Sequence, residues 1–257
     1  MNILLSNDDG YSAPGINVLR DVLLKKHRIF LIAPDRNRSA ISHGITMFNG
    51  LVLHQYEKDL WSCSGTPADC VVLALKSGFI NEKIDLVISG INAGPNLGTD
   101  IIYSGTCAAS REAVLAGCPS IALSLDVKEG EKPDFLPLAR LVEKNLEYLM
   151  GFTDGNKKKC FVNLNAKNLS EKCDLREYKG LKYSDLLSVR KYRDKMSFKK
   201  EGENIIASLV DTSPLEKAEK FSDAWYSDSG YAVFSSVPAA PYALPFSSFG
   251  FSDSSSN

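Results

Sequence analysis

The 257-residue chain carries 30 basic and 31 acidic residues, and 44% of its residues are hydrophobic. This composition is typical of a globular protein with one sizeable core. The net charge of −1 provides no overall attraction to nucleic acid or to an anionic membrane surface, so we predict neither partner. We find no signal-peptide pattern at the N-terminus and no apolar run long enough to span a bilayer, and we therefore expect a cytoplasmic location.

The first half of the chain alternates between short apolar runs and amphipathic segments. The run Asn2–Ser6 is typical of a buried parallel strand, and Pro14–Lys26 has the apolar spacing of a helix. With a second strand at Ile29–Ala33, these segments form a βαβ unit. The pattern then predicts strands at Ile84–Ser89, Ser120–Leu125 and Cys160–Leu164, and helices from Pro67 with Thr66 as N-cap, at Thr106–Ala116 and at Phe135–Leu149. The expected fold is α/β, with a doubly wound, mostly parallel sheet.

Two regions interrupt this pattern. Alternating apolar residues at Leu51–Leu53 and Leu60–Cys63 predict a small β-hairpin inserted beside the sheet. From Leu181 the remaining strands, including Ile205–Val210, are expected to be antiparallel. We therefore divide the chain into an α/β core (1–180), a C-terminal antiparallel β arm (181–245) and a flexible, serine-rich tail (246–257).

The six cysteines show no Cys-x-x-Cys spacing. A zinc site or a disulfide framework is therefore not indicated, and we expect reduced, buried thiols.

Polar residues follow three of the predicted parallel strands. The adjacent carboxylates Asp8 and Asp9 follow the first strand, while the loops 35–39 and 90–96 follow the second and third. Asn-Asp-Asp-Gly is also good turn chemistry, so a simple turn is one interpretation. Because strand ends of a parallel sheet meet at one edge, the alternative is an all-oxygen site for a divalent cation such as Mg²⁺ or Mn²⁺.

A second feature is the turn Ser104-Gly105-Thr106 at the start of a predicted helix. Its hydroxyls and backbone N–H groups could bind a phosphate at the positive end of the helix dipole, although an isolated turn of this kind more often means that Ser104 or Thr106 is a simple N-cap. A cation site and an anion site on one sheet edge together favour phosphoryl transfer to water.

Four long motifs in residues 1 to 125 resemble the SurE family, the stationary-phase survival nucleotidases. They are NILLSNDDGYSAPGI, APDRNRSAISHGIT, SGTPADCV and SGINAGPNLGTDIIYSGTCAASREA. The resemblance implies a Rossmann-like core and a metal-dependent phosphatase that hydrolyses nucleoside 5′- and 3′-monophosphates, and in some members short polyphosphate. It also implies a homodimer or homotetramer formed by exchange of C-terminal arms.

The same resemblance assigns roles to particular residues. One divalent ion would be held by Asp8, Asp9, Ser39 and Asn92. Asn96, Ser104, Gly105 and Thr106 would surround the phosphate, with the loop of His43 close by, and the residues expected to act in catalysis are Asp8, Asp9 and Asn96. The second half departs from the family pattern, with Ala166-Lys167 in place of Val-Pro and Ser222-Asp223 in place of Thr-Asp.

Two other functions compete with this interpretation. A haloacid-dehalogenase-type phosphatase also carries an aspartate after its first strand, but its second aspartate comes two residues later, whereas Asp8 and Asp9 are adjacent. A nucleotide-binding module without catalysis would not require the oxygen-rich strand ends. Trapping a phospho-aspartyl intermediate would support the first, and an inactive protein with Mn²⁺ and a chromogenic phosphomonoester would support the second.

Overall fold

The computed structural model describes residues 1–153, 159–169, 177–211 and 214–241. Within these ranges a nine-stranded sheet has the order β3-β4-β2-β1-β5-β6-β7-β11-β8. Its strands are β1 (Asn2–Ser6), β2 (Arg28–Pro34), β3 (Leu53–Glu57), β4 (Leu60–Cys63), β5 (Leu86–Ala93), β6 (Ser120–Asp126), β7 (Cys160–Lys167), β8 (Leu181–Tyr183) and β11 (Ala232–Pro238). The helices are α1 (Pro14–Leu23), α2 (Pro67–Lys76), the short 3-10 helix η1 (Gly98–Ile102), α3 (Gly105–Leu115), α4 (Leu136–Lys144), α5 (Leu146–Met150) and α6 (Asp223–Asp228).

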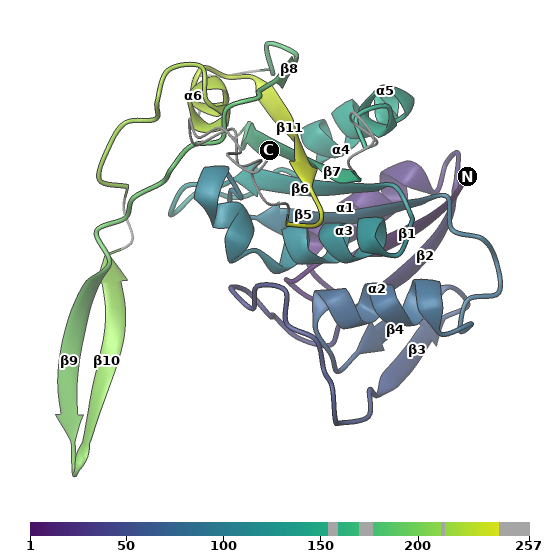
Figure 1. The fold of residues 1–257 in the computed structure, drawn as a ribbon, viewed down its shortest axis with the longest axis horizontal. Helices are drawn as coiled ribbons and strands as arrows, with labels where there is room; N and C mark the ends of the chain where they lie inside the picture. The colour runs from purple at the N-terminus through teal and green to yellow at the C-terminus, as the bar shows by residue number, and fades with distance from the viewer. Residues whose placement is uncertain (154–158, 170–176, 212–213, 242–257) are drawn as a thin grey trace, which may run out of the picture.

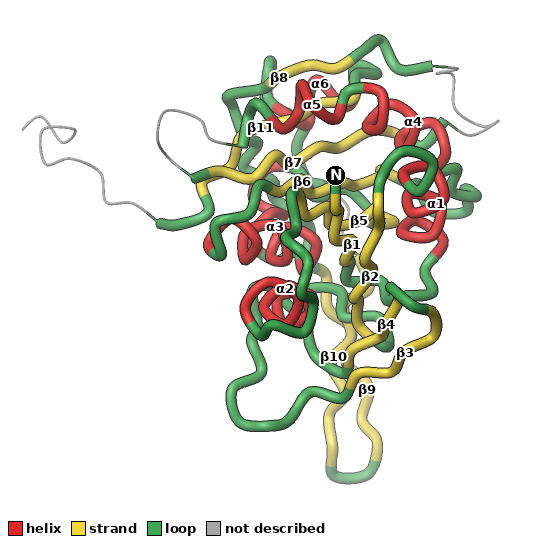
Figure 2. Tube along the Cα trace, turned by 90° about the vertical axis from the view of Figure 1, so that its right-hand side faces the viewer, coloured by secondary structure: helices red, strands yellow, loops and turns green. Residues whose placement is uncertain are grey.

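The strands from β4 to β7 are parallel and lie between two layers of helices (Figure 2). Leu5, on one face, belongs to a core packed under α1, α4 and α5, whereas Leu4 belongs to a core packed under α2 and α3. Because both faces are covered, β1 can be apolar at consecutive positions. The predicted α/β, doubly wound fold is confirmed.

The strand order reverses between β1 and β5. From β1 the chain builds outward through β2 to β4, and from β5 it builds the other way through β6 to β7. Such a reversal leaves a crevice at the carboxyl ends of the two strands, which is the usual ligand position in open α/β sheets. Asp8 and Asn92 stand at these two strand ends.

Helix α2 begins as the sequence predicts. The Thr66 hydroxyl accepts the Asp69 N–H at 3.1 Å, and the Asp69 carboxylate accepts the Thr66 N–H at 2.9 Å, while Pro67 occupies the first turn. This reciprocal capping box satisfies N–H groups that have no partner within the helix.

Several predicted bounds differ by one to four residues, and two of the differences change the path of the chain. The single helix expected at Phe135–Leu149 is two helices, α4 and α5, because the turn is interrupted at Asn145, whose side chain donates to the Leu141 carbonyl at 2.8 Å. The strand expected to end at Ser89 continues to Ala93, with a register shift between Ser89 and Asn92 against β6. Such an irregularity bends a strand and changes the direction of its side chains, so Asn92 projects from a strand end and not from a loop.

A hairpin forms as expected and β4 has the predicted bounds, but β3 begins at Leu53, where the predicted strand was to end. The hairpin is also part of the main sheet, because β4 pairs in parallel with β2. The prediction that all strands after Leu181 are antiparallel is wrong. Strand β8 pairs in parallel with β11, and β11 pairs antiparallel with β7. The chain thus returns to the sheet near its C-terminus.

A second, two-stranded antiparallel sheet projects far from the body of the protein (Figure 1). It consists of β9 (Lys195–Glu201) and β10 (Asn204–Asp211), and we call it the hairpin arm. Its large apolar side chains are exposed, namely Met196, Phe198, Ile205, Ile206, Leu209 and Val210. The tail predicted at 246–257 lies outside the described residues.

Cys63, Cys70, Cys107 and Cys118 are free and buried, as expected, and Cys160 is also buried. Cys173 lies outside the described residues. No helix in the described ranges has the length and apolar character needed to cross a membrane.

Candidate active site

The turn after β1 explains how two carboxylates can be adjacent. The Asn7 side chain accepts the Gly10 N–H at 3.1 Å and donates to the Gly10 carbonyl at 2.9 Å, so these two residues close the turn between them. Asp8 and Asp9 take no part in this closure. The turn interpretation is therefore correct for Asn7 and Gly10, while the two carboxylates remain available for another purpose.

Asp8 is buried against the first turn of α3. The Thr106 hydroxyl donates to the Asp8 carboxylate at 2.5 Å. A Cβ added to Gly105 would lie 2.8 Å from the Asp8 Cβ and 3.0 Å from a carboxylate oxygen, so only glycine permits this approach. Burial raises the pKa of Asp8 to about 6, the hydrogen bond from Thr106 opposes this shift, and the charge of Asp9 adds to it.

Asp9 is half-buried and faces the end of β5. Its carboxylate accepts the Ala93 N–H at 3.2 Å and the Asn37 side-chain amide at 3.5 Å. Burial raises the pKa of Asp9, and the Ala93 N–H lowers it in part. Asn92 donates its amide to the Gly94 carbonyl at 2.9 Å, an arrangement that leaves its side-chain oxygen for a ligand.

The loop after β2 is joined to the same place. The Arg38 N–H donates to the Asp8 carbonyl at 2.7 Å, and the Ser39 N–H donates to the Asn37 side chain at 2.8 Å. Ser39 is exposed. The structure thus brings together the ends of β1, β2 and β5, which are far apart in the sequence.

These side chains offer carboxylate, amide and hydroxyl oxygens. Among the described residues there is no cluster of three or more His, Cys, Asp or Glu side chains that could hold a metal. Zinc prefers the nitrogen and sulfur atoms of His and Cys, whereas the donors gathered here are oxygen atoms. Two carboxylates with an amide oxygen and a hydroxyl instead match the preference of a hard divalent cation, and positive charge between Asp8 and Asp9 would relieve their repulsion.

Asn96 is held by a buried polar network that sequence reasoning missed. Its backbone N–H donates to the Asn165 side chain at 2.8 Å, its side chain donates to Ser124 at 2.8 Å, and its carbonyl accepts from Asn163 at 2.8 Å. Ser124 lies on β6, and Asn163 and Asn165 lie on β7. Polar residues at alternate positions of a strand with both faces covered were the available signal, because buried polar groups need partners.

In the predicted phosphate-binding turn, Ser104 and Thr106 make different contacts. Ser104 is the N-cap of α3 and accepts the Cys107 N–H at 3.0 Å, so its own hydroxyl hydrogen remains for a ligand. Thr106 is fully buried and donates to Asp8. In this structure the start of α3 therefore stabilises a carboxylate.

His43 contacts α3 through its ring. Its Nε2 lies 3.1 Å from the Glu112 carboxylate, which also pairs with the Lys76 ammonium at 2.7 Å. Nearby, Thr46 donates through both its N–H and its hydroxyl to Asp69. These contacts hold the loop of residues 39–50 over α2 and α3, and the His43 ring is engaged in this anchoring.

The C-terminal part of the chain holds the segment 97–100. The Asp223 carboxylate accepts the N–H groups of Gly98 at 2.6 Å and Ser188 at 2.9 Å. A Cβ on Gly98 would lie 1.9 Å from the Ser188 carbonyl oxygen, and its φ of +53° also favours glycine.

Asp100 makes a second connection to the same region. It accepts the Tyr192 hydroxyl at 2.8 and 2.7 Å and pairs with Arg190 at 3.2 Å. Tyr192 lies three residues before the hairpin arm. The root of the arm is therefore bonded to the segment that leads to Ser104.

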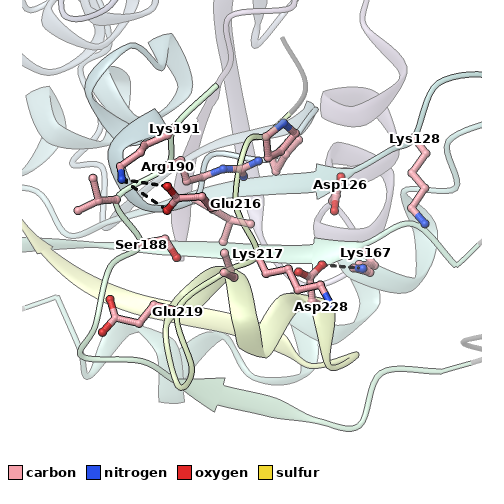
Figure 3. Close-up of a pocket in the computed structure, with 16 residues that line it drawn as sticks. Asp126, Lys128, Lys167, Ser188, Arg190, Lys191, Glu216, Lys217, Glu219 and Asp228 are labelled. Atoms are coloured by element: carbon pink, nitrogen blue, oxygen red, sulfur yellow. Dashed lines mark hydrogen bonds and ion pairs between the residues drawn. The ribbon is translucent and has the colours of Figure 1, made fainter. Parts of the chain in front are cut away.

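A charged cavity of about 590 Å³ lies beside this segment and is lined in part by Pro95 and Leu97. Its charged lining includes Lys167, Lys191 and Glu216 (Figure 3). Two ion pairs cross its lining, Lys191–Glu216 at 3.1 Å and Lys167–Asp228 at 2.9 Å. One joins β7 to α6, and the other joins the two segments that flank the hairpin arm.

Comparison with known proteins places this arrangement in a family. The model of the family described as "Survival protein SurE" matches residues 3–193. The chain belongs to the SurE family. The resemblance read from the four motifs is thus confirmed, and in this SurE protein those motifs supply all of the residues at the three converging strand ends.

Individual SurE relatives agree over most of the chain. The protein named 5′-nucleotidase SurE from Clostridium beijerinckii is 35% identical over 97% of this chain and 95% of its own length. The protein of the same name from Treponema pallidum is 44% identical over 65% of this chain and 91% of its own. The crystal structure of the SurE protein from Aquifex aeolicus superposes with a TM-score of 0.78 at 33% identity, covering 93% of this chain and 94% of that one.

Proposed function

We propose that the protein is a divalent-metal-dependent phosphomonoesterase that hydrolyses nucleoside 5′-monophosphates, and by the same chemistry 3′-monophosphates and short polyphosphate. The observation that carries this proposal is the position of Asp8 and Asp9 at the β1–β5 switch point, beside Asn92 and the loop of Ser39. The nucleotidase names of its relatives support the choice of substrate.

The proposed roles follow from the contacts. Asp8, Asp9, Asn92 and Ser39 would hold Mg²⁺ or Mn²⁺, which when bound lowers the pKa of a coordinated water and neutralises phosphoryl oxygens. The Ser104 hydroxyl and the Asn96 amide would donate to the phosphoryl group, because each has a donor hydrogen beyond its internal bond. Gly105 allows the backbone at the start of α3 to approach Asp8 closely.

Thr106 has a different role in this proposal from the one that its motif suggests. Its hydroxyl holds Asp8 in its charged form and in one orientation, and it does not contact phosphate. It is therefore a positioning residue that acts through Asp8.

The proposal is tested by the hydrolysis of AMP by purified protein. We expect phosphate release with Mg²⁺ or Mn²⁺ and none after dialysis against excess EDTA. Undiminished release in EDTA would eliminate the metal-dependent reaction. Trapping of a covalent phospho-aspartyl enzyme would instead favour the haloacid-dehalogenase mechanism.

The metal site is tested with Asp9→Asn, for which the exposed helical residue Asp21→Asn is the matched control. We expect Asp9→Asn to weaken Mn²⁺ binding in calorimetry and to lower kcat by orders of magnitude, because one of two carboxylate charges is lost. Asp21→Asn should leave both unchanged. If Asp9→Asn binds Mn²⁺ as the parent does, the carboxylate pair is not the metal site.

We also propose that the hairpin arm joins subunits of a homodimer or homotetramer. Its exposed side chains, such as Phe198 and Ile205, form an apolar surface that a second copy would cover. Tyr192 and Pro214 are bridged at its root, so a short glycine turn can replace residues 194–212. The shortened protein should give a smaller mass by light scattering, and an unchanged mass would contradict the proposal. A truncation at residue 211 is unsuitable because it also removes β11.

A further inference from the structure

Three exposed apolar residues lie around the start of α3. Ile41, Ile102 and Tyr103 are 40%, 59% and 65% exposed. Scattered apolar residues are normal on a protein surface, so exposure alone has no functional meaning. What distinguishes these three is that hydrogen bonds hold their backbones together, and that Ile41 approaches Gly105, which also contacts Asp8.

The backbone around Ile41 is fixed in an unusual conformation. Ala40 and Ser42, on either side of it, have φ angles of 57° and 56°, a region that non-glycine residues rarely adopt. Ser42 donates its N–H to the Tyr103 carbonyl at 3.0 Å and its hydroxyl to the Ile102 carbonyl at 2.8 Å. Strained conformations that persist in this way are concentrated at functional sites.

The Ile41 side chain reaches the proposed phosphate site. A Cβ added to Gly105 would lie 3.2 Å from Ile41 Cγ2 and 2.8 Å from Asp8 Cβ, so both side chains approach the same backbone position. Ser39, a proposed metal ligand, is two residues before Ile41. An apolar surface thus begins where the site for the phosphoryl group ends.

We infer that Ile41, Ile102 and Tyr103 form an apolar wall that contacts the nucleobase of the substrate. This inference rests on the proposed function, because that function places the phosphoryl group beside Asp8. The Ser42 hydroxyl is engaged by the Ile102 carbonyl, and the three side chains of the wall are two aliphatic groups and an aromatic ring, so the wall contacts a base mainly by packing and stacking. Every base has a π-face, and purines have the larger one. The enzyme therefore accepts all bases and prefers purines.

The experiment compares AMP with ribose 5-phosphate, which has the same phosphate and sugar but lacks the base. We expect Tyr103→Ala and Ile41→Ala to raise the KM for AMP about tenfold and to leave ribose 5-phosphate turnover unchanged. The preference for AMP over CMP should fall in the same variants. Phe48→Ala is the matched control, because this residue belongs to the same loop and is 96% exposed; neither substrate should be affected.

Two outcomes would contradict the proposal that the apolar wall contacts the nucleobase. Equal losses for AMP and ribose 5-phosphate would show that these residues only support the loop, and unchanged kinetics for both would show that they do not contact the base. Equilibrium dialysis in EDTA measures the same contact without turnover. AMP should bind the parent more tightly than ribose 5-phosphate does, and Tyr103→Ala should remove the difference. Equal binding of AMP and ribose 5-phosphate to the parent protein would contradict a contact between the apolar wall and the base. A parent protein that binds AMP more tightly but hydrolyses neither ester would contradict only the proposed function.

Discussion

The Thr106 hydroxyl donates a hydrogen bond to the Asp8 carboxylate, and both side chains are buried. We expect Thr106→Val to weaken Mn²⁺ binding about tenfold or more, because a hydrogen bond to a charged group contributes about 1.5–3 kcal/mol. Thr106→Ser retains the hydroxyl and should retain the affinity. Calorimetric Mn²⁺ titration measures both. A valine variant with normal Mn²⁺ affinity and a raised KM would show instead that Thr106 contacts the phosphate.

Gly105 is expected to tolerate no side chain. Gly105→Ala places a Cβ 2.8 Å from that of Asp8, so Asp8 must move away from Thr106. We predict a large loss of kcat together with weaker Mn²⁺ binding. Gly50→Ala is the control, since a Cβ there meets nothing within 4 Å. Normal activity in Gly105→Ala would mean that the position of Asp8 is not critical.

The stability of the metal-free protein should depend on pH through Asp8. Its pKa is raised from 3.8 to about 6, so between these values the folded state holds a proton that the unfolded state has released. The contribution of Asp8 to the free energy of unfolding is fully present below pH 3.8 and is lost as the pH rises through 6. The total change is about 3 kcal/mol. Asp8→Asn removes this dependence.

The measurement is urea unfolding in EDTA at pH 5 and pH 8. We expect Asp8→Asn to gain stability relative to the parent as the pH rises between these values, while Asp21→Asn follows the parent. A constant difference between Asp8→Asn and the parent at the two pH values would contradict the raised pKa of Asp8 in the folded protein.

Loss of the Tyr192 hydroxyl should loosen the segment that precedes Ser104. Tyr192→Phe removes the bonds to Asp100 and leaves that half-buried carboxylate paired with Arg190 alone. The expected cost is about 1 kcal/mol of unfolding free energy, with faster amide exchange in residues 97–104. Tyr183→Phe removes an exposed hydroxyl from β8 as a control. Unchanged exchange in Tyr192→Phe would show that the segment is held by Asp223 without help from the arm root.

Local sequence patterns were sufficient to predict the helices and strands of the α/β core. The apolar run of β1, the capping box of α2 and the apolar spacing of α1 each depend on neighbours in the sequence, so their physical causes are visible there. Predicted bounds differ where a single polar residue changes the path of the chain. Asn145 competes for the backbone and divides one amphipathic helix into two.

Long-range partners could not be predicted in this way. That Thr106 bonds to Asp8, 98 residues away, and that β8 pairs with β11 across about 50 residues, depends on tertiary packing and not on local propensity. The motifs placed the strand-end residues at one edge of the sheet. They did not indicate that Ser104 caps α3 while Thr106 donates to Asp8, because that difference depends on the three-dimensional position of Asp8. The placement of His43 beside Glu112 is a further case, because no periodic pattern connects the two residues.

The position of β11 has a consequence for synthesis on the ribosome. Among the described residues this strand is the last of the sheet in sequence order, yet it lies between β7 and β8. During translation the polar backbone edge of β7 stays unpaired until residue 238 has emerged, although the strands from β1 to β7 can already assemble. Because an open strand edge invites pairing with other chains, the nascent protein is most vulnerable to aggregation in this interval, and slow translation between residues 167 and 238 would prolong it.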